Sequence, residues 1–148
     1  MKTISYKGTI PIGEQERIKL STLNGKTGYK ISKFNVIGTS PMKTDQSIIG
    51  QVFKSDQTGS ITDVVNFTNS DLIAVATYED TNSKELPNSN HIIFDNEKFN
   101  QDIFINITDA SGGTVACNYY IELEQFSLDL NTSTYHTLKN IRSGNTLV

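Results

Sequence analysis

Three carboxylates within eight residues are the first candidates for chemistry. The stretch HIIFDNEKFNQDIFINITD, residues 91–109, places Asp95, Glu97 and Asp102 between two apolar runs. Calcium is a hard cation that takes six to eight oxygen ligands, which clustered carboxylates and loop carbonyls can supply. The EF-hand pattern is absent, and the spacing does not define a glycosidase carboxylate pair. The favoured interpretation is a solvated turn, in which Asp and Asn hydrogen-bond their own backbone, with calcium as the alternative.

Nucleophilic catalysis would have to use the only cysteine and the two histidines, Cys117, His91 and His136. Cys117 lies on the apolar phase of an expected strand, where a thiol behaves as a small hydrophobic group. One cysteine and two distant histidines also fall short of a tetrahedral zinc site. Gly112-Gly113 lies between expected strands rather than before a helix, so no phosphate-binding loop is indicated. We therefore predict no catalytic residue, no cofactor, no firm metal site and a protein that is not an enzyme.

The elements that must position these residues are mostly strands, and turn signals suggest three hairpins. Residues 17–23 and GYKISKFNVI flank Asn24-Gly25, a dipeptide that favours tight hairpin turns. SIIGQVFKS and SITDVVNF flank the turn at residues 56–59. Residues 103–108 and 117–124 alternate apolar and polar side chains on either side of a loop at residues 111–113. These segments predict antiparallel pairing.

Three finer features follow from the alternation. DLIAVATYE is apolar on both faces, which predicts a central strand covered on both sides. The apolar phase reverses near Glu124-Gln125, which indicates a bulge or the end of a strand. Tyr119 and Tyr120 must face opposite sides of one strand. If Tyr119 is core, Tyr120 is available for carbohydrate stacking or a protein interface.

About nine short strands predict an all-β fold, an antiparallel β-sandwich that is jelly-roll-like or Greek-key. We expect the sandwich to span residues 1–130. Residues 131–148 should form a short helix and tail of the same single domain, with an apolar stripe of Tyr135, Leu138 and Ile141. The longest loop, about residues 79–90, carries the apolar pair Leu86-Pro87. These two segments are candidate partner contacts because loops and termini usually carry them.

Composition limits the classes of partner. The chain has 148 residues, 36% of them hydrophobic, and a net charge of −3 without a basic block, which argues against nucleic-acid binding. No apolar run is long enough to cross a bilayer, so no membrane association is expected. The first 20 residues contain no apolar core typical of a secretory signal, so we expect synthesis in a cytoplasm without export.

Several strings resemble small proteins of marine tailed phages, including phages of cyanobacteria and Pelagibacter-like hosts. They are YKGTIPIGEQERIKLSTLNGKTGYKISKF, IIFDNEKFNQDIFI, ACNYYIELEQFSLD and TLKNIRSG. The resemblance implies a non-enzymatic virion structural protein, made in the host cytoplasm, that binds major capsid or tail proteins. We expect it to be a homo-oligomer or to be present in many copies on a symmetric particle. It carries no set of binding residues. The alternative is a carbohydrate- or receptor-binding module of a tail fibre or spike. Expected partner contacts are Leu86, Pro87, Tyr120, Tyr135, Leu138 and Ile141.

Overall fold

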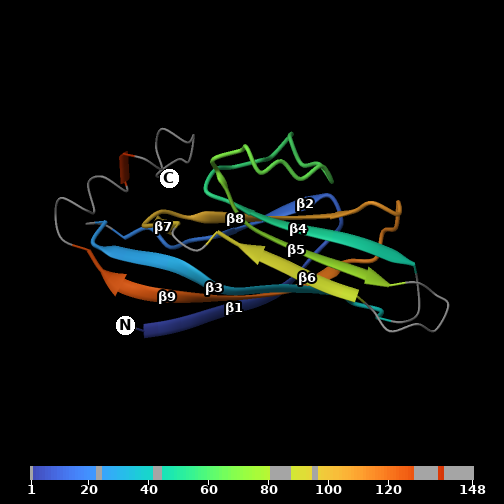
Figure 1. Ribbon diagram of the computed structural model, residues 1–148, viewed down its shortest axis with the longest axis horizontal. Coiled ribbons are helices and arrows are strands. Elements are labelled where there is room, and N and C mark those ends of the chain that lie inside the picture. The colour runs from blue at the N-terminus through green and yellow to red at the C-terminus, as the bar shows by residue number, and fades with distance from the viewer. Residues whose placement is uncertain are drawn as a thin grey trace.

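A computed structural model describes residues 2–22, 25–41, 45–80, 88–94, 97–128 and 137–138. Nine strands lie in these residues and form two stacked antiparallel sheets (Figure 1). In chain order the strands are β1 (Lys2–Ile10), β2 (Glu14–Ile18), β3 (Thr27–Gly38), β4 (Gln46–Phe53), β5 (Leu72–Asp80), β6 (Asn88–Ile93), β7 (Lys98–Phe99), β8 (Ile103–Asp109) and β9 (Cys117–Ser127).

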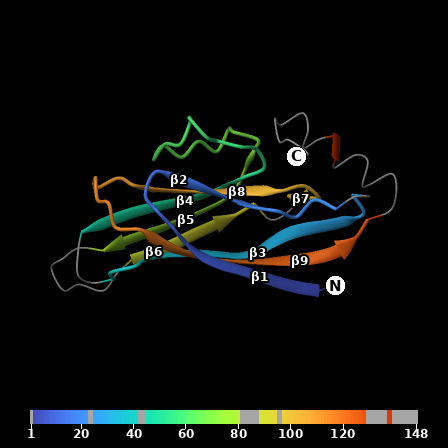
Figure 2. The same cartoon turned by 180° about the vertical axis from the view of Figure 1, so that it is seen from behind.

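One sheet has four strands in the order β1-β9-β3-β7, and the other has five in the order β2-β8-β4-β5-β6. Every pair of neighbouring strands is antiparallel. Figure 2 shows the same two layers from behind, with β1, β9 and β3 in one layer and β2, β8 and β4 in the other. The prediction of an all-β protein with sandwich-like antiparallel sheets is therefore confirmed.

The core lies between the sheets and is built by alternation along each strand. Ile103, Ile105 and Ile107 of β8 are each 0% exposed and face the other sheet. Cys117, Tyr119, Ile121 and Leu123 of β9 do the same from the opposite layer. Full burial of one such isoleucine is worth roughly 1.5–3 kcal/mol relative to leaving it exposed. This two-residue period fixes which face of each strand remains available for a site.

All three expected hairpin pairings are wrong, although two of them join true strands. β2 pairs with β8 in the five-stranded sheet, whereas β3 pairs with β9 in the four-stranded sheet. β8 and β9, which flank the loop at residues 111–113, also belong to different sheets. The connecting segments therefore cross from one layer to the other. A turn signal reports a change of chain direction, and it does not report which strand will become the neighbour.

The third error is at SITDVVNF, because residues 54–71 contain no strand and β4 pairs with β5 instead. Side chains of this β4–β5 loop bond backbone N–H groups two residues ahead, at Thr58, Val64, Thr68 and Asp71. Such local bonds compete with strand pairing. Val65 of the loop packs with Phe53, Leu72 and Val75 on the outer face of the five-stranded sheet. This cover confirms that β5 is buried on both faces.

The reversal of apolar phase near Glu124-Gln125 does not mark a bulge in β9, which runs without interruption to Ser127. The irregularity lies opposite, in β3, between Ile31 and Lys33. Phe126 is instead an outward-facing aromatic with Lys98 Nζ 5.2 Å from its ring centroid. An aromatic ring can be apolar and still favour an outer face when a cation covers it.

Only Thr137 and Leu138 of the expected C-terminal helix belong to the described residues, so a helix there is not confirmed. Tyr135 and Ile141 lie outside them, as do Leu86 and Pro87 of the long loop. Leu138 is 53% exposed. No helix in the described part of the chain is long and apolar enough to cross a membrane.

Candidate functional site

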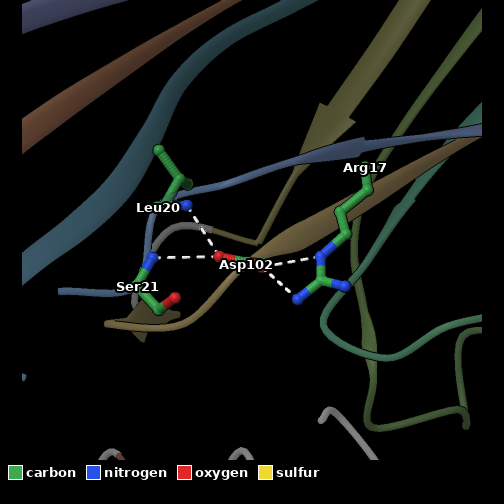
Figure 3. A network of polar contacts seen from close by, with 4 residues as sticks. All are labelled: Arg17, Leu20, Ser21 and Asp102. Carbon is green, nitrogen blue, oxygen red and sulfur yellow. Dashed lines mark hydrogen bonds and ion pairs between the residues drawn. The ribbon is translucent and has the colours of Figure 1, made fainter. Parts of the chain in front are cut away.

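Asp102, the third of the candidate carboxylates, holds the corner where the chain leaves β2 (Figure 3). One carboxylate oxygen accepts hydrogen bonds from the backbone N–H groups of Leu20 and Ser21, at 2.7 and 2.9 Å. The other contacts Arg17 through Nε at 2.7 Å and Nη2 at 2.5 Å. Because residues 19–22 have left the sheet, these bonds replace the strand pairing that their N–H groups lack. Asp102 therefore organises the crossover from β2 to β3.

The electrostatics of this corner keep Asp102 ionised. Burial raises the pKa of Asp102, but hydrogen bonds from Ser21, Leu20 and Arg17, with the Arg17 charge, outweigh burial and hold that pKa below its usual value. Hydrogen bonds to the charged form of a carboxylate favour that form. The carboxylate is thus already stabilised by the protein.

Glu97 is also engaged, by a buried lysine. Lys54 Nζ lies 2.6 Å from Glu97 Oε1, and the two side chains are 2% and 24% exposed. Asp95 lies outside the described residues. Within the described ranges no group of three or more His, Cys, Asp or Glu residues could hold a metal ion. A calcium ion bound by Glu97 and Asp102 would therefore have to compete with both ion pairs.

The residues considered for nucleophilic catalysis lie in different surroundings. Cys117 is buried in the core, as expected, with Sγ 3.2 Å from the carbonyl oxygen of Asn118. Burial raises the pKa of the Cys117 thiol to about 12, so the thiol is protonated at neutral pH. A protonated thiol is a poor nucleophile. His91 is exposed on β6, and His136 lies outside the described residues.

A groove of about 880 Å³ is lined in part by Tyr120. Tyr119 is 6% exposed and faces the core, so Tyr120 is on the outer face as expected. Its cross-strand neighbours are Lys7 of β1 and Asn35 of β3. Lys33 Nζ lies 5.9 Å from the centroid of the Tyr120 ring. Tyrosine here combines an apolar ring with hydrogen-bonding neighbours, which suits recognition of a partner.

Two strand edges border this groove. β3 pairs with β7 only at Tyr29 and Lys30, so its later residues pair with β9 alone. In the other sheet, β6 pairs with β5 alone among the described strands. Both β3, through Val36 and Ile37, and β6, through His91, line the groove. Unpaired edges present backbone N–H and C=O groups to which another chain can add a strand.

The sequence prediction missed the buried polar residues in and directly after the strands of the five-stranded sheet. Lys54 is 1% exposed, Gln51 is 3% exposed and Asn106 is 2% exposed. Asn106 stands between two isoleucines that are 0% exposed, Ile105 and Ile107. The available signal was a polar residue at the outward position of a strongly apolar strand, which predicts either an exposed face or a covered polar site.

Comparisons with protein-family models, with curated proteins and with solved structures find no match for this chain. The features that bear on function are two engaged carboxylates, a protonated thiol, and a groove lined by an aromatic side chain and two strand edges. The groove is suited to recognition of a partner.

Proposed function

We propose that the chain is a non-enzymatic phage virion structural protein that docks on other virion proteins, as a capsid decoration or cement protein or as a tail-associated protein. The observation that carries the proposal is the groove around Tyr120 with its two strand edges. The resemblance of the sequence to marine phage proteins supplies the partner class. The protein acts in the virion after synthesis in the host cytoplasm.

The groove offers the two contributions that a docking surface needs. Ile37 is 46% exposed at its border, and its burial under a partner would add hydrophobic stabilisation. The edge of β3 can add main-chain hydrogen bonds, which are insensitive to side-chain identity. On a symmetric particle, many copies with individually modest contacts would reach high avidity.

The strand order supports a jelly-roll topology for this subunit. Strands β1-β9-β3-β7 face β2-β8-β4-β5, the interleaved order of a ribbon of paired strands rolled into two sheets, with β6 added at one edge. Jelly rolls recur in viral capsid proteins and lectins. We include a short C-terminal helix in the same domain, since Asn100 Nδ2 donates a hydrogen bond to Thr137 Oγ1 at 2.8 Å.

Tyr120→Ala tests the docking surface. Phe126→Ala is a matched control because Phe126 is an aromatic residue on the same face of β9 but outside the groove. In particles assembled with each variant, the copy number relative to the major capsid protein is measured by peptide mass spectrometry. We expect Tyr120→Ala to reduce incorporation about tenfold, in the range of interface hot spots, and Phe126→Ala to leave it unchanged. Normal incorporation of Tyr120→Ala would contradict the groove as the docking surface.

A second candidate is a carbohydrate- or receptor-binding module of a tail fibre or spike. It is favoured by the polar neighbours of Tyr120, where Thr9 Oγ1 donates a hydrogen bond to Asn118 Oδ1 at 2.7 Å. An aromatic ring beside amide and hydroxyl groups suits the face and edges of a sugar. Glycan-array binding that Tyr120→Ala abolishes and Tyr120→Phe retains would favour this function over docking on virion proteins.

A further inference from the structure

A second, smaller hollow lies on the outer face of the five-stranded sheet, beneath the β4–β5 loop. Its volume is about 260 Å³. The outer face of β4 and β8 forms its floor through Gln51, Phe53 and Asn106, and the loop forms its walls. In Figure 1 this loop rises from the ends of β4 and β5, away from the four-stranded sheet. The pocket is therefore separate from the groove around Tyr120.

Two of the floor residues, Gln51 and Asn106, belong to a row of three amide residues. Gln15 of β2, Asn106 of β8 and Gln51 of β4 are direct cross-strand neighbours. Gln15 anchors the loop, since its Nε2 donates to Asp56 Oδ1 at 2.8 Å and its Oε1 accepts from the backbone N–H of Gln57 at 2.8 Å. Gln51 anchors it again, through Nε2 to the carbonyl oxygen of Thr62 at 3.1 Å.

The middle amide is different from its two neighbours. Asn106 is 2% exposed, and its Oδ1 is buried without a hydrogen-bond partner in the part of the chain that the structure describes. A buried polar atom left without a partner costs about 1–3 kcal/mol, so native structures normally supply one. Because Asn106 lines the pocket, a molecule in the pocket can supply that donor.

The lining defines the chemistry of this molecule. None of the lining residues is ionisable, and most carry amide or hydroxyl groups. They are Gln51, Phe53, Gln57, Ser60, Thr62, Val64, Asn66, Asn69 and Asn106. The side-chain oxygens of Asn66 and Asn69 accept hydrogen bonds from the backbone N–H groups of Thr68 and Asp71, and the amide nitrogens of both residues are donors. A charged ligand would find no counterion here, whereas hydroxyl groups can both donate to Asn106 Oδ1 and accept from amides.

We propose that this pocket binds one neutral, polyhydroxylated ring, such as the terminal monosaccharide of a glycan. The volume corresponds to about nine water molecules at roughly 30 Å³ each, enough for a single sugar ring and too small for a longer saccharide to enter. Phe53, in the floor of the pocket, supplies an apolar surface for the ring carbons. The pocket shares no lining residue with the docking groove, and neither proposal depends on the other.

The test is a titration of the intact, isotope-labelled chain with glucose, galactose, mannose and N-acetylglucosamine, followed by ¹⁵N–¹H NMR. We expect at least one sugar to cause saturable shifts of the Asn106 and Gln51 side-chain amides and of the β4–β5 loop. Glucuronic acid, the carboxylate counterpart of glucose, should bind at least several-fold more weakly than the neutral sugar. Millimolar affinity is sufficient, since a single ring makes few contacts.

Asn106→Leu should weaken binding at least tenfold, because leucine keeps a similar shape and cannot accept a hydrogen bond. Thr108→Val is the matched control, on the same face of β8 but outside the pocket, and should bind as the wild type does. Asn66→Ala, at an exposed loop position, gives a second variant should Asn106→Leu fold poorly, and should weaken binding several-fold. The proposal is overturned if no sugar causes saturable shifts, as expected if only water fills the pocket. It is also overturned if the shifts lie elsewhere, or if Asn106→Leu or Asn66→Ala binds with unchanged affinity.

Discussion

Asp102 directly precedes β8, and Asn106 is the fourth residue of that strand. Each residue is 2% exposed, yet their hydrogen bonding differs. Asp102 accepts hydrogen bonds from two backbone N–H groups and pairs with Arg17. The Oδ1 atom of Asn106 accepts none among the described residues. Burial alone therefore does not tell what a polar residue does.

This difference distinguishes a buried polar residue that stabilises the fold from one that can bind another molecule. A buried carboxylate whose lone pairs are satisfied within the chain fixes the position of the segments it joins, here the crossover from β2 to β3. A buried amide oxygen without a partner, on a residue that lines a pocket, can be satisfied by a molecule from outside. Asp102, which first suggested chemistry, is thus a structural residue. The row of amides formed by Gln15, Asn106 and Gln51 on the outer face of the five-stranded sheet is a better candidate for recognition than Asp102.

The largest effect on stability should come from Asp102→Ala. This change leaves the N–H groups of Leu20 and Ser21 and the Arg17 charge without their acceptor, which should lower the free energy of unfolding by about 3 kcal/mol. Urea denaturation at neutral pH measures it. Asp63→Ala removes the same charge from an exposed loop position and should change stability by no more than about 0.5 kcal/mol. Equal effects of the two variants would contradict the role of Asp102.

The next largest effect should come from Glu97→Gln, because it leaves the ammonium group of Lys54 buried without its counterion. We expect a loss of about 2 kcal/mol, typical of a charged hydrogen bond at a partly buried site. The double variant Lys54→Met/Glu97→Gln removes both charges and should recover most of the loss. If the double variant is no more stable than Glu97→Gln, the ion pair is not the cause.

The stability contribution of Asp102 should depend on pH. Its folded-state pKa is lowered, so the contribution is fully present above the unfolded pKa of about 3.9 and is lost as the pH falls through the folded pKa. Asp102→Asn lacks this dependence. The difference in unfolding free energy between the wild type and Asp102→Asn should therefore shrink below about pH 4. A difference that stays constant down to acid unfolding would disagree with this assignment.

A smaller effect is expected at Gln15, the cross-strand neighbour of Asn106, whose side chain is hydrogen-bonded to the β4–β5 loop. Gln15→Ala removes the anchors to Asp56 and Gln57 and should cost about 1 kcal/mol. Amide hydrogen exchange across residues 54–71 should accelerate, while exchange in β9 should not change. Unaltered exchange in the loop would show that Gln15 does not hold it.

Alternation in the sequence located several of the strands, but it did not predict which strands pair. Alternation identified the buried face of β8 and β9 correctly, because a half-buried strand must repeat every two residues. It could not show that residues 19–22 cross between sheets, since the partner that permits the crossing, Asp102, is distant in sequence. Nor could it distinguish SITDVVNF from a strand, because its turns depend on local side-chain bonds that override an apolar pattern.

The candidate sites were also predictable where they depend on the face of one strand, and unpredictable where they depend on strand pairing. Tyr120 was predictable, because its adjacency to Tyr119 forces one ring outward. The pocket was not, because Gln15, Gln51 and Asn106 become neighbours only through the pairing of β2, β8 and β4.

The most direct test of the contrast between the two buried residues is the free energy of unfolding of Asn106→Leu, measured beside Asp102→Ala in the same buffer. If Asn106 is reserved for recognition, its replacement by an apolar residue should leave stability within about 0.5 kcal/mol of the wild type, or raise it, because an unpartnered polar atom is removed. Asp102→Ala should lose several times more. A loss for Asn106→Leu as large as that for Asp102→Ala would contradict the account, because it would show that the Asn106 amide is a folding contact.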